Sequence, residues 1–203
     1  MKIIGVGRNY AAHAKELNNA LPTEPVLFLK PDTALLKNND DFYFPSFTKE
    51  IHFEIELVIK ISKEGKYIQE KFAGNYFDEV GLGIDFTARD LQDQAKAAGL
   101  PWSIAKGFNN SAPISEFIPK GNFADLQNIS FGLQQNGAWK QQGTTADMVF
   151  NIHFLISYIS QFFTLKKGDL IYTGTPSGVG PIAIGDVLEG YLEGQKMLSC
   201  AVK

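Results

Sequence analysis

Residues 51–61 read IHFEIELVIKI, and two kinds of side chain alternate along them. Every odd position is Ile, Phe or Leu, whereas the even positions include the two glutamates Glu54 and Glu56. A period of two is typical of a β-strand, whose successive side chains point to opposite faces of a sheet. The pattern therefore predicts one long strand over 51–62. It also places both glutamates on one face, about 7 Å apart along the strand.

The rest of the chain reads mostly as strands with a few helices. A second alternating stretch, VGLGIDFT, covers 80–87, and Asn136-Gly137 predicts a tight hairpin within 129–143. Residues 88–99 have helical composition, and 145–163 carry apolar side chains at helical spacing. Glycine and proline turns recur between the strands, so the sequence predicts a mainly β domain of the sandwich or barrel kind with peripheral helices.

Composition limits the classes of partner. The chain has 203 residues, enough for one domain of ordinary size, and a formal net charge of −3 with a pI of about 5.6. A slightly acidic chain with scattered lysines is not expected to bind nucleic acid or an anionic membrane as its main partner. No stretch is apolar for long enough to span a bilayer.

A third carboxylate lies near the glutamate pair in this scheme. Asp85 shares a face with Gly81 and Gly83, and the missing side chains of the glycines predict a hollow beside it. Hard divalent cations such as Mg²⁺ take oxygen ligands, so Glu54, Glu56 and Asp85 are candidate metal ligands. A bound dication would also offset the repulsion between the two glutamates. The alternative is a solvated polar face, the commonest meaning of an alternating strand.

The segment GRNYAAHAKE, residues 7–16, supplies a candidate acid–base pair. His13 and Glu16 are three residues apart and share a face if the segment is helical. Glu16 would then orient His13 as a general base acting on water. The alternative is an incidental pair at the end of a surface helix. No serine lies in a G-x-S-x-G elbow, so activated water fits better than a covalent intermediate.

Three further segments carry polar groups with two possible roles. The loop TGTPSGVGP, 173–181, either presents backbone N–H groups to an anion or simply connects two strands. Lys106, between apolar residues, either reaches solvent or pairs with an anion. Arg89 and Asp90 are adjacent, and we expect a structural ion pair between them.

Together these segments resemble the fumarylacetoacetate hydrolase family. The motifs that carry the resemblance cover nearly the whole chain and stand in the order of the family: GRNYAAHAKE, PVLFLKP, HFEIELVI, GIDFTARDLQ, GLPWSIAKGF and TGTPSGVGP. The similarity is greatest to its single-domain branch of acylpyruvases and oxaloacetate decarboxylases. The resemblance implies a mixed β-sandwich roll with peripheral helices, usually dimeric, that binds Mg²⁺ or Mn²⁺. It also implies one catalytic domain over 1–203, with an N-terminal strand and a lid segment in 1–24.

The resemblance assigns roles to individual residues. Glu54, Glu56 and Asp85 match the metal ligands, and His13 with Glu16 matches the pair that activates water. Positions that hold the carboxylate and oxo groups of the substrate match three residues in this chain: Gln92, Lys106 and Thr175. Arg8 lies in a matching motif without an assigned role.

The implied activity is metal-dependent cleavage of the C3–C4 bond of a small 2-oxo acid through a pyruvate enolate. Both acylpyruvate hydrolysis and oxaloacetate decarboxylation fit this description. Relatives that isomerise, decarboxylate or tautomerise oxo-dicarboxylates leave a second activity open, and a non-enzymatic β-sandwich binding module is a remote third. From the resemblance we expect a homodimer, and from the lack of a recognisable targeting extension a cytoplasmic protein.

Overall fold

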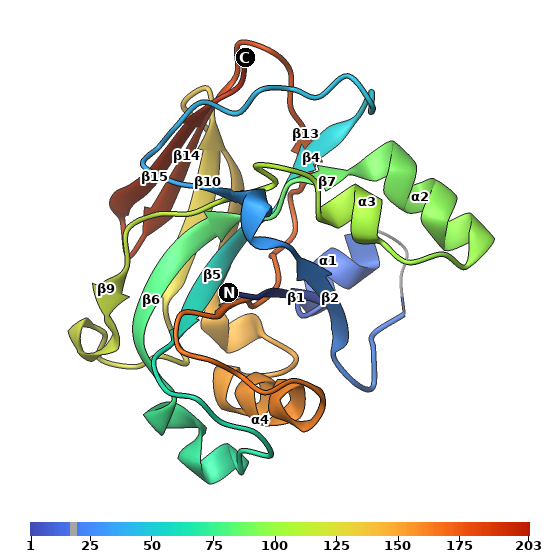
Figure 1. The fold of residues 1–203 in the computed structure, drawn as a ribbon. Helices are drawn as coiled ribbons and strands as arrows, with labels where there is room; N and C mark the ends of the chain where they lie inside the picture. Colours follow the sequence, from blue (N-terminus) through green and yellow to red (C-terminus); the bar gives the residue numbers. More distant parts are fainter. Residues whose placement is uncertain (17–19) are drawn as a thin grey trace.

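A computed structural model describes residues 1–16 and 20–203 of the chain. The helices are α1 (Ala11–Glu16), α2 (Arg89–Ala98), α3 (Ser103–Lys106) and α4 (Ile152–Phe162), with 3₁₀ turns η1 (Asp32–Ala34), η2 (Glu70–Asn75), η3 (Lys120–Asn122) and η4 (Thr145–Asp147). The strands are β1 (Ile3–Gly7), β2 (Val26–Lys30), β3 (Leu35–Leu36), β4 (Ile51–Phe53), β5 (Ile55–Ile61), β6 (Phe77–Ile84), β7 (Thr87–Ala88), β8 (Ala112–Pro113), β9 (Ile118–Pro119), β10 (Ser130–Gln135), β11 (Ala138–Thr144), β12 (Leu170–Tyr172), β13 (Gly180–Pro181), β14 (Val187–Leu192) and β15 (Gln195–Ala201). Figure 1 shows their arrangement.

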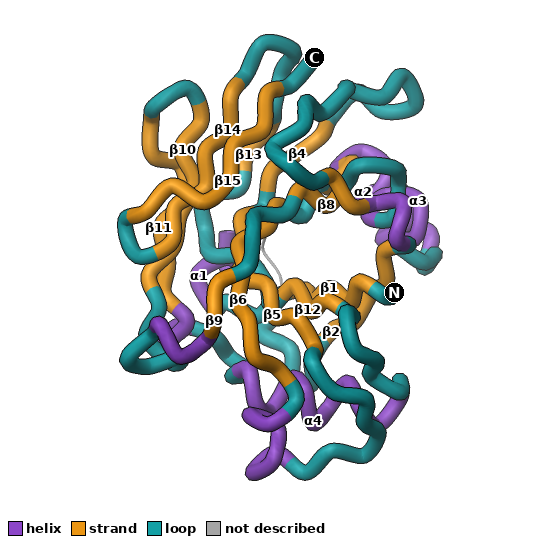
Figure 2. The backbone as a smooth tube through the Cα atoms, turned by 60° about the vertical axis from the view of Figure 1, so that its left-hand side comes forward, coloured by secondary structure: helices purple, strands orange, loops and turns teal. Residues whose placement is uncertain are grey.

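Two sheets form the sandwich. The larger is mixed and runs in the order β2-β1-β12-β5-β6-β9, with β1 and β12 parallel. The other sheet, β11-β10-β14-β15, is antiparallel and lies beside β5 and β6 (Figure 2). The sheets approach so closely at Gly190 that a Cβ atom there would lie 2.8 Å from a methyl carbon of Leu82. The predicted mainly β sandwich with peripheral helices is confirmed.

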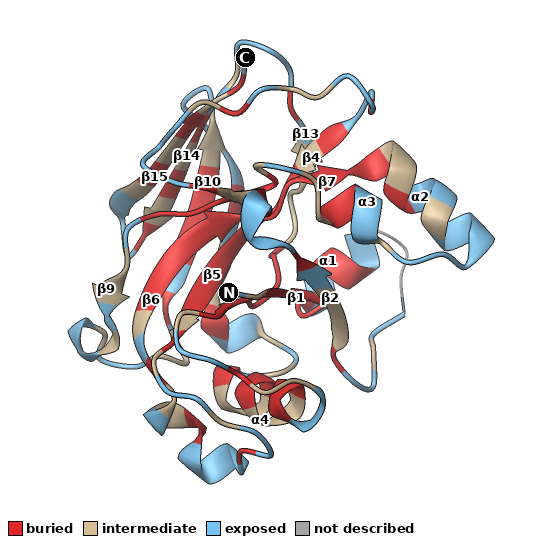
Figure 3. Cartoon of the chain, in the orientation of Figure 1, coloured by how far each residue is buried: buried red, intermediate tan, exposed pale blue. Residues whose placement is uncertain are grey.

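The core follows the alternation that opened the sequence. The odd positions from Ile51 to Ile61 are at most 1% exposed, and they pack in one cluster with side chains of the antiparallel sheet such as Leu133 and Leu188. The opposite face of β5 is also covered, since Val58 belongs to a second buried cluster with Ile114 and Leu170. Figure 3 shows β5 and β6 buried along most of their length. Glu54 and Glu56 are also buried, so the solvated polar face that the alternation also allowed does not apply to these two residues.

The predicted strand over 51–62 is two strands. β4 pairs with β7 and β13 in a separate three-stranded sheet, whereas β5 belongs to the large sheet, and Glu54 lies between them. The segment that pairs with β4 and β5 changes sheet opposite Glu54. Its β6 part, which pairs with β5, ends at Ile84, and its β7 part, which pairs with β4, begins at Thr87. The backbone N–H of Asp85 donates to the carbonyl of Glu54 at 2.8 Å across this corner. Two chain segments therefore bend together, and each places a carboxylate at the bend.

The helices cover the ends and sides of the sandwich. α2 and α3 lie beside the three-stranded sheet, and α4 packs against η2 (Figure 1). The predicted helix over 145–163 begins only at Ile152, because Asn151 caps it by accepting from the N–H of Phe154. The residues before it form η4 and an irregular segment, in which the N–H of Val149 donates to the carbonyl of Asn9. No helix among the described residues is long and apolar enough to cross a membrane.

Candidate active site

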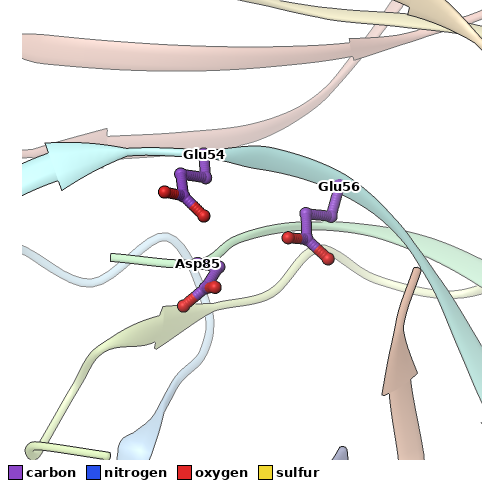
Figure 4. Close-up of side chains that lie close together, drawn as sticks. All are labelled: Glu54, Glu56 and Asp85. Carbon is purple, nitrogen blue, oxygen red and sulfur yellow. The ribbon is translucent and has the colours of Figure 1, made fainter. Parts of the chain in front are cut away.

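The three predicted metal ligands meet in one buried place. Glu54 and Glu56 project from the β4–β5 segment toward Asp85, which follows β6 (Figure 4). One carboxylate oxygen of each lies within 4.8 Å of the other two. The exposed fractions of Glu54, Glu56 and Asp85 are 5%, 1% and 0%. Carboxylates are buried in this way only when they are paired or bind a cation.

Three buried cations surround two of the carboxylates. The ammonium of Lys106 donates to Glu54 at 2.9 Å and to Asp85 at 2.5 Å. The guanidinium of Arg89 donates to the other oxygen of Glu54 at 2.5 Å. Lys30 reaches Asp85 from behind, with its nitrogen 2.7 Å from Oδ1. The Lys30 ammonium also lies within hydrogen-bond distance of the carbonyls of Phe86, Lys106 and Ser111 and of the Ser111 hydroxyl, which is more acceptors than its three protons can serve. Asp85 Oδ1 accepts no well-directed hydrogen bond among the described residues.

Glu56 differs from its two neighbours. Its contact within the described residues is the backbone N–H of Gly174, at 2.7 Å, and no lysine or arginine pairs with it there. Burial raises the pKa of Glu56 well above the ordinary value, and the charges of Asp85 and Glu54 raise it further. Burial acts on Glu54 in the same direction, but Lys106 and Arg89 outweigh it and hold the pKa of Glu54 below its ordinary range.

These features fit a divalent cation. The site offers carboxylate oxygens only, the donor type that Mg²⁺ and Mn²⁺ prefer. Asp85 Oδ1 has a lone pair that no hydrogen-bond donor uses, and Glu56 lacks a cationic partner among the described residues. A dication between the three side chains would bind the unused lone pair of Asp85 and give Glu56 a positively charged partner.

His13 and Glu16 line up beside this cluster. His13 Nδ1 lies 3.3 Å from Glu16 Oε2, and the imidazole is buried against the same pocket as the three carboxylates. Glu16 also accepts from the N–H of Gly178 at 3.0 Å. That hydrogen bond connects the end of α1 to the loop at residues 173–181, called the glycine loop below. The part of the predicted lid at 17–19 lies outside the described residues.

The glycine loop does bind anions, and those anions are carboxylates of the protein itself. Gly174 donates to Glu56 and Gly178 donates to Glu16, so the loop connects the candidate metal ligands to the candidate base. Gly178 has φ +97°, and a Cβ atom there would lie 2.1 Å from the carbonyl oxygen of Lys140. Only glycine fits this position without moving the loop.

Gln92, Lys106 and Thr175 all line the pocket, but their side chains are not equally available. Gln92 Oε1 accepts from Arg89 at 2.6 Å, which leaves the amide NH₂ group to donate. The Thr175 hydroxyl donates to the carbonyl of Ile55 and accepts from Gln141, both at 2.8 Å. A 2-oxo acid offers only acceptors, so the hydroxyl of Thr175 has no proton for it in this arrangement. The role of Thr175 in holding the substrate stays a prediction, and it would require this hydroxyl to exchange its bond to Ile55 for one to the substrate.

Two further expectations differ from the structure. The space above Gly83 is filled by the ring of Tyr172, which would lie 2.5 Å from a Cβ atom there, and Phe117 fills the space above Gly81. The pocket therefore lies beside Asp85 and not above the glycines. Arg89 pairs with Glu54, whereas Asp90 accepts hydrogen bonds from Thr48 and Lys49.

Sequence reasoning missed Lys30 and the role of Arg89. The one usable signal was the spacing of Arg89 and Gln92, three apart in a helix, since these are the buried residues of α2. Nothing in the sequence around Lys30 indicates that its ammonium reaches Asp85. The pocket wall is aromatic, formed by Phe28 and Trp102, whose ring centroids are 6.2 Å apart.

Comparisons with known proteins identify the family of the chain. The family description "Fumarylacetoacetate (FAA) hydrolase C-terminal" matches residues 2–203, and the chain belongs to this family. It is 46% identical over 193 residues to oxaloacetate tautomerase, mitochondrial, of Arabidopsis thaliana, covering 95% of this chain and 86% of the relative. It is 48% identical over 189 residues to oxaloacetate decarboxylase, mitochondrial, of Dictyostelium discoideum, covering 93% and 87%.

A solved structure gives the same picture of the fold. The crystal structure of fumarylpyruvate hydrolase from Pseudomonas aeruginosa in complex with Mn²⁺ and pyruvate has a TM-score of 0.95 with this chain. The two are 36% identical, and the match covers 100% of this chain and 89% of that one. The resemblance inferred from the motifs is confirmed at the level of the family and of the fold.

The expectation of a cytoplasmic protein is overturned by the same comparison. The Arabidopsis and Dictyostelium relatives are both named as mitochondrial proteins, as is a human relative that is 43% identical over 192 residues. The expectation rested on the residues at the start of the chain. Those residues form β1 and α1 of the folded domain and say nothing about cellular location.

Proposed function

We propose that this protein is an enzyme that cleaves the C3–C4 bond of small 2-oxo acids, hydrolysing acylpyruvates, decarboxylating oxaloacetate, or both. One observation carries the proposal: the buried carboxylate cluster, the Lys106 ammonium and His13 line a single pocket, and Glu16 lies 3.3 Å from His13 Nδ1. The names of the relatives support the substrate class, since two refer to oxaloacetate and one to fumarylpyruvate.

We propose that Glu54, Glu56 and Asp85 hold Mg²⁺ or Mn²⁺. Oxygen donors suit both ions, and the Mn²⁺ bound in the Pseudomonas relative supports a divalent ion of this kind. When bound, the ion would act as a Lewis acid that stabilises negative charge developing on a substrate oxygen. The pocket also contains fixed donors of the chain that stabilise the same charge.

Lys106 and Gln92 would hold the 2-oxo acid end of the substrate. The three N–H donors of Lys106 point at Glu54, Asp85 and the Thr87 hydroxyl, and one of them would turn to the substrate on binding. Gln92 is held by Arg89, so its NH₂ group would donate from a fixed position. Donors that are in place before the reaction stabilise developing charge without reorganisation.

His13 would act as the base in hydrolysis. Glu16 accepts the Nδ1–H of the imidazole, which leaves Nε2 to take a proton from water. The resulting hydroxide would add to C4 of an acylpyruvate. The C3–C4 bond would then break, with its electron pair leaving on the pyruvate enolate and the acyl group released as a carboxylic acid. Loss of CO₂ from oxaloacetate gives the same enolate without water, so decarboxylation would not require His13.

A second candidate activity is keto–enol tautomerisation of oxaloacetate. It is favoured by the Arabidopsis relative, which carries that name at 46% identity. The reaction moves a proton between C3 and the oxygen on C2 and breaks no carbon–carbon bond. His13 would again be the group that accepts the proton, because Glu16 bonds its Nδ1 and its Nε2 makes no hydrogen bond among the described residues.

The test measures four activities on one preparation of the protein. Pyruvate release from acetylpyruvate and from oxaloacetate is followed with Mg²⁺, with Mn²⁺ and with EDTA, and loss of the enol absorbance of oxaloacetate reports tautomerisation. Metal-dependent pyruvate release supports cleavage. Enol loss without pyruvate would leave tautomerisation as the function, and isomerase activity would appear on unsaturated oxo-dicarboxylates. A non-enzymatic binding module would change none of these substrates above background.

We further propose that the chain acts as one catalytic domain and assembles as a homodimer. A single core cluster reaches from Ile4 to Val202, which supports one domain. Apolar side chains on β2 and α3 are exposed, Leu29 at 45% and Ile104 at 72%, and such residues are typical of an interface between subunits. Sedimentation of the purified protein at micromolar concentration tests the assembly.

A further inference from the structure

Most cations around the pocket are already committed to carboxylates of the protein. Lys106, Arg89 and Lys30 pair with Glu54 and Asp85 at its buried end. Lys96, on α2, pairs with Asp93 at 3.2 Å. A charged group at the far end of a substrate therefore needs a further partner.

Arg8 is the remaining arginine or lysine among the described lining residues, and it makes no ion pair within the part of the chain that the structure describes. Residues 17–19 are Leu, Asn and Asn and include no acidic side chain. Arg8 is half-buried, whereas the carboxylate cluster is fully buried. The guanidinium therefore belongs to the part of the pocket that opens to solvent.

The backbone of Arg8 is strained. Its φ is +61°, a left-handed conformation that side chains other than those of glycine and asparagine seldom adopt. The chain is fixed on both sides: Gly7 pairs with Val26 in β1–β2, and the Asn9 amide donates to the carbonyls of Phe150 and Thr173 at 3.0 Å and 2.8 Å. Strain of this kind persists where the surroundings impose it, and it collects at functional sites.

We propose that Arg8 binds the second carboxylate of a 2-oxo dicarboxylic acid whose chain extends beyond C4, such as fumarylpyruvate, and makes the enzyme selective for such dicarboxylates over monocarboxylic acylpyruvates. The proposal rests on the proposed function, because it assumes that the 2-oxo acid end lies at the carboxylate cluster. The chain beyond C4 then extends along the wall of Phe28 and Trp102 toward the open part of the pocket. A guanidinium binds a carboxylate through two parallel hydrogen bonds, and Arg8 has no other anion to bind among the described residues.

The distal carboxylate takes no part in the bond cleavage of a substrate such as fumarylpyruvate. Its contact with Arg8 is therefore the same in the ground state and in the transition state. An interaction of that kind lowers KM and leaves kcat unchanged. A structural role for Arg8 would instead lower kcat for every substrate.

The test compares fumarylpyruvate with acetylpyruvate, which share the reacting end and differ in the distal carboxylate. Arg8→Gly removes the guanidinium and accepts φ +61° without strain, so the thermal midpoint should stay equal or rise. We expect its KM for fumarylpyruvate to rise roughly tenfold or more, with kcat for both substrates and KM for acetylpyruvate within about twofold of wild type. Arg8→Lys keeps the charge and should recover part of the loss.

Lys71→Gln removes one positive charge from η2, outside the pocket, and serves as the control that should change neither KM. Added salt should raise the KM of the wild type for fumarylpyruvate and leave that of Arg8→Gly nearly constant. Equal losses on both substrates, or an unchanged ratio of the two KM values, would overturn the role of Arg8 while the proposed function stands. A wild-type protein that cleaves neither substrate but decarboxylates oxaloacetate would remove this inference alone, and one that acts on none of the three would remove the proposed function as well.

Discussion

Replacing Glu56 by glutamine separates metal binding from folding. Glu56 is buried between two other carboxylates, has no cationic partner among the described residues and accepts one N–H bond from Gly174. A glutamine of the same shape keeps that bond through its carbonyl oxygen and carries no charge. We therefore expect Glu56→Gln to change the free energy of unfolding of the metal-free protein by less than about 1 kcal/mol.

Glu54→Gln should behave differently in the same protein. Glu54 pairs with both Arg89 and Lys106, and breaking a buried ion pair by neutralising one partner costs about 3 kcal/mol or more. For a chain of 203 residues, 1 kcal/mol corresponds to about 2–4 °C in the thermal midpoint. The metal-free Glu54→Gln protein should therefore melt at least about 6 °C below wild type.

The second part of the prediction concerns the shift of the thermal midpoint when metal is added. A ligand present at 100 times its Kd stabilises the folded state by about 2.7 kcal/mol, or about 5–11 °C for this size of protein. Wild type should show that shift in Mg²⁺ or Mn²⁺, and Glu56→Gln should lose most of it despite its intact stability. The assay is thermal unfolding after EDTA treatment, with and without added metal. A Glu56→Gln protein that keeps the full metal shift would show that the ion binds elsewhere.

Other consequences concern the base, the loop and the cysteine. His13→Ala should lower the rate of acylpyruvate hydrolysis by about 10²–10⁴-fold and leave oxaloacetate decarboxylation within a few-fold of wild type, and hydrolysis within a few-fold would contradict its role as base. Gly178→Ala should lower the thermal midpoint by more than Gly168→Ala: both have positive φ, but a Cβ atom at 178 would lie 2.1 Å from the Lys140 carbonyl and one at 168 has no neighbour within 4 Å. An equal fall in the thermal midpoint of both variants would mean that the positive φ, and not the contact with the Lys140 carbonyl, destabilises Gly178→Ala. Burial raises the pKa of the Cys200 thiol to about 12, so the thiol stays protonated up to well above pH 8. Iodoacetamide should therefore label Cys200 in denaturant and not in the folded protein, and fast labelling of the native chain would contradict its burial.

The alternation in residues 51–61 predicted which side chains are buried but not where the strand ends. The odd positions stay apolar on both sides of Glu54, so a change of sheet at that residue leaves the period of two intact. The bend depends on Asp85, which bonds to the Glu54 carbonyl from a segment about thirty residues away. A local pattern carries no information about such a partner.

The candidate site was predictable where its residues lie on one element and not where they converge from several. Spacing placed Glu54 beside Glu56 and His13 beside Glu16, and both pairs are close in the structure. Lys30 reaches Asp85 from a different strand, and the ring of Tyr172 fills the hollow expected above Gly83. Those contacts join β2 and β12 to β6 and the residues that follow it, and they depend on the strand order of the larger sheet, which a local pattern does not predict.

The distribution of charge explains why this cluster calls for a metal ion at all. Glu54 has two cationic partners, Arg89 and Lys106, and Asp85 has Lys30 and Lys106, so the chain itself compensates these two carboxylates. Glu56 lies within the same cluster with a single backbone N–H, and its pKa is raised accordingly. If the cluster were only structural, a neutral side chain at position 56 would avoid the repulsion at no loss of packing. An ionised carboxylate at that position is stabilised when a further positive charge enters the cluster, and that requirement, more than the count of acidic residues, supports the proposed cation site.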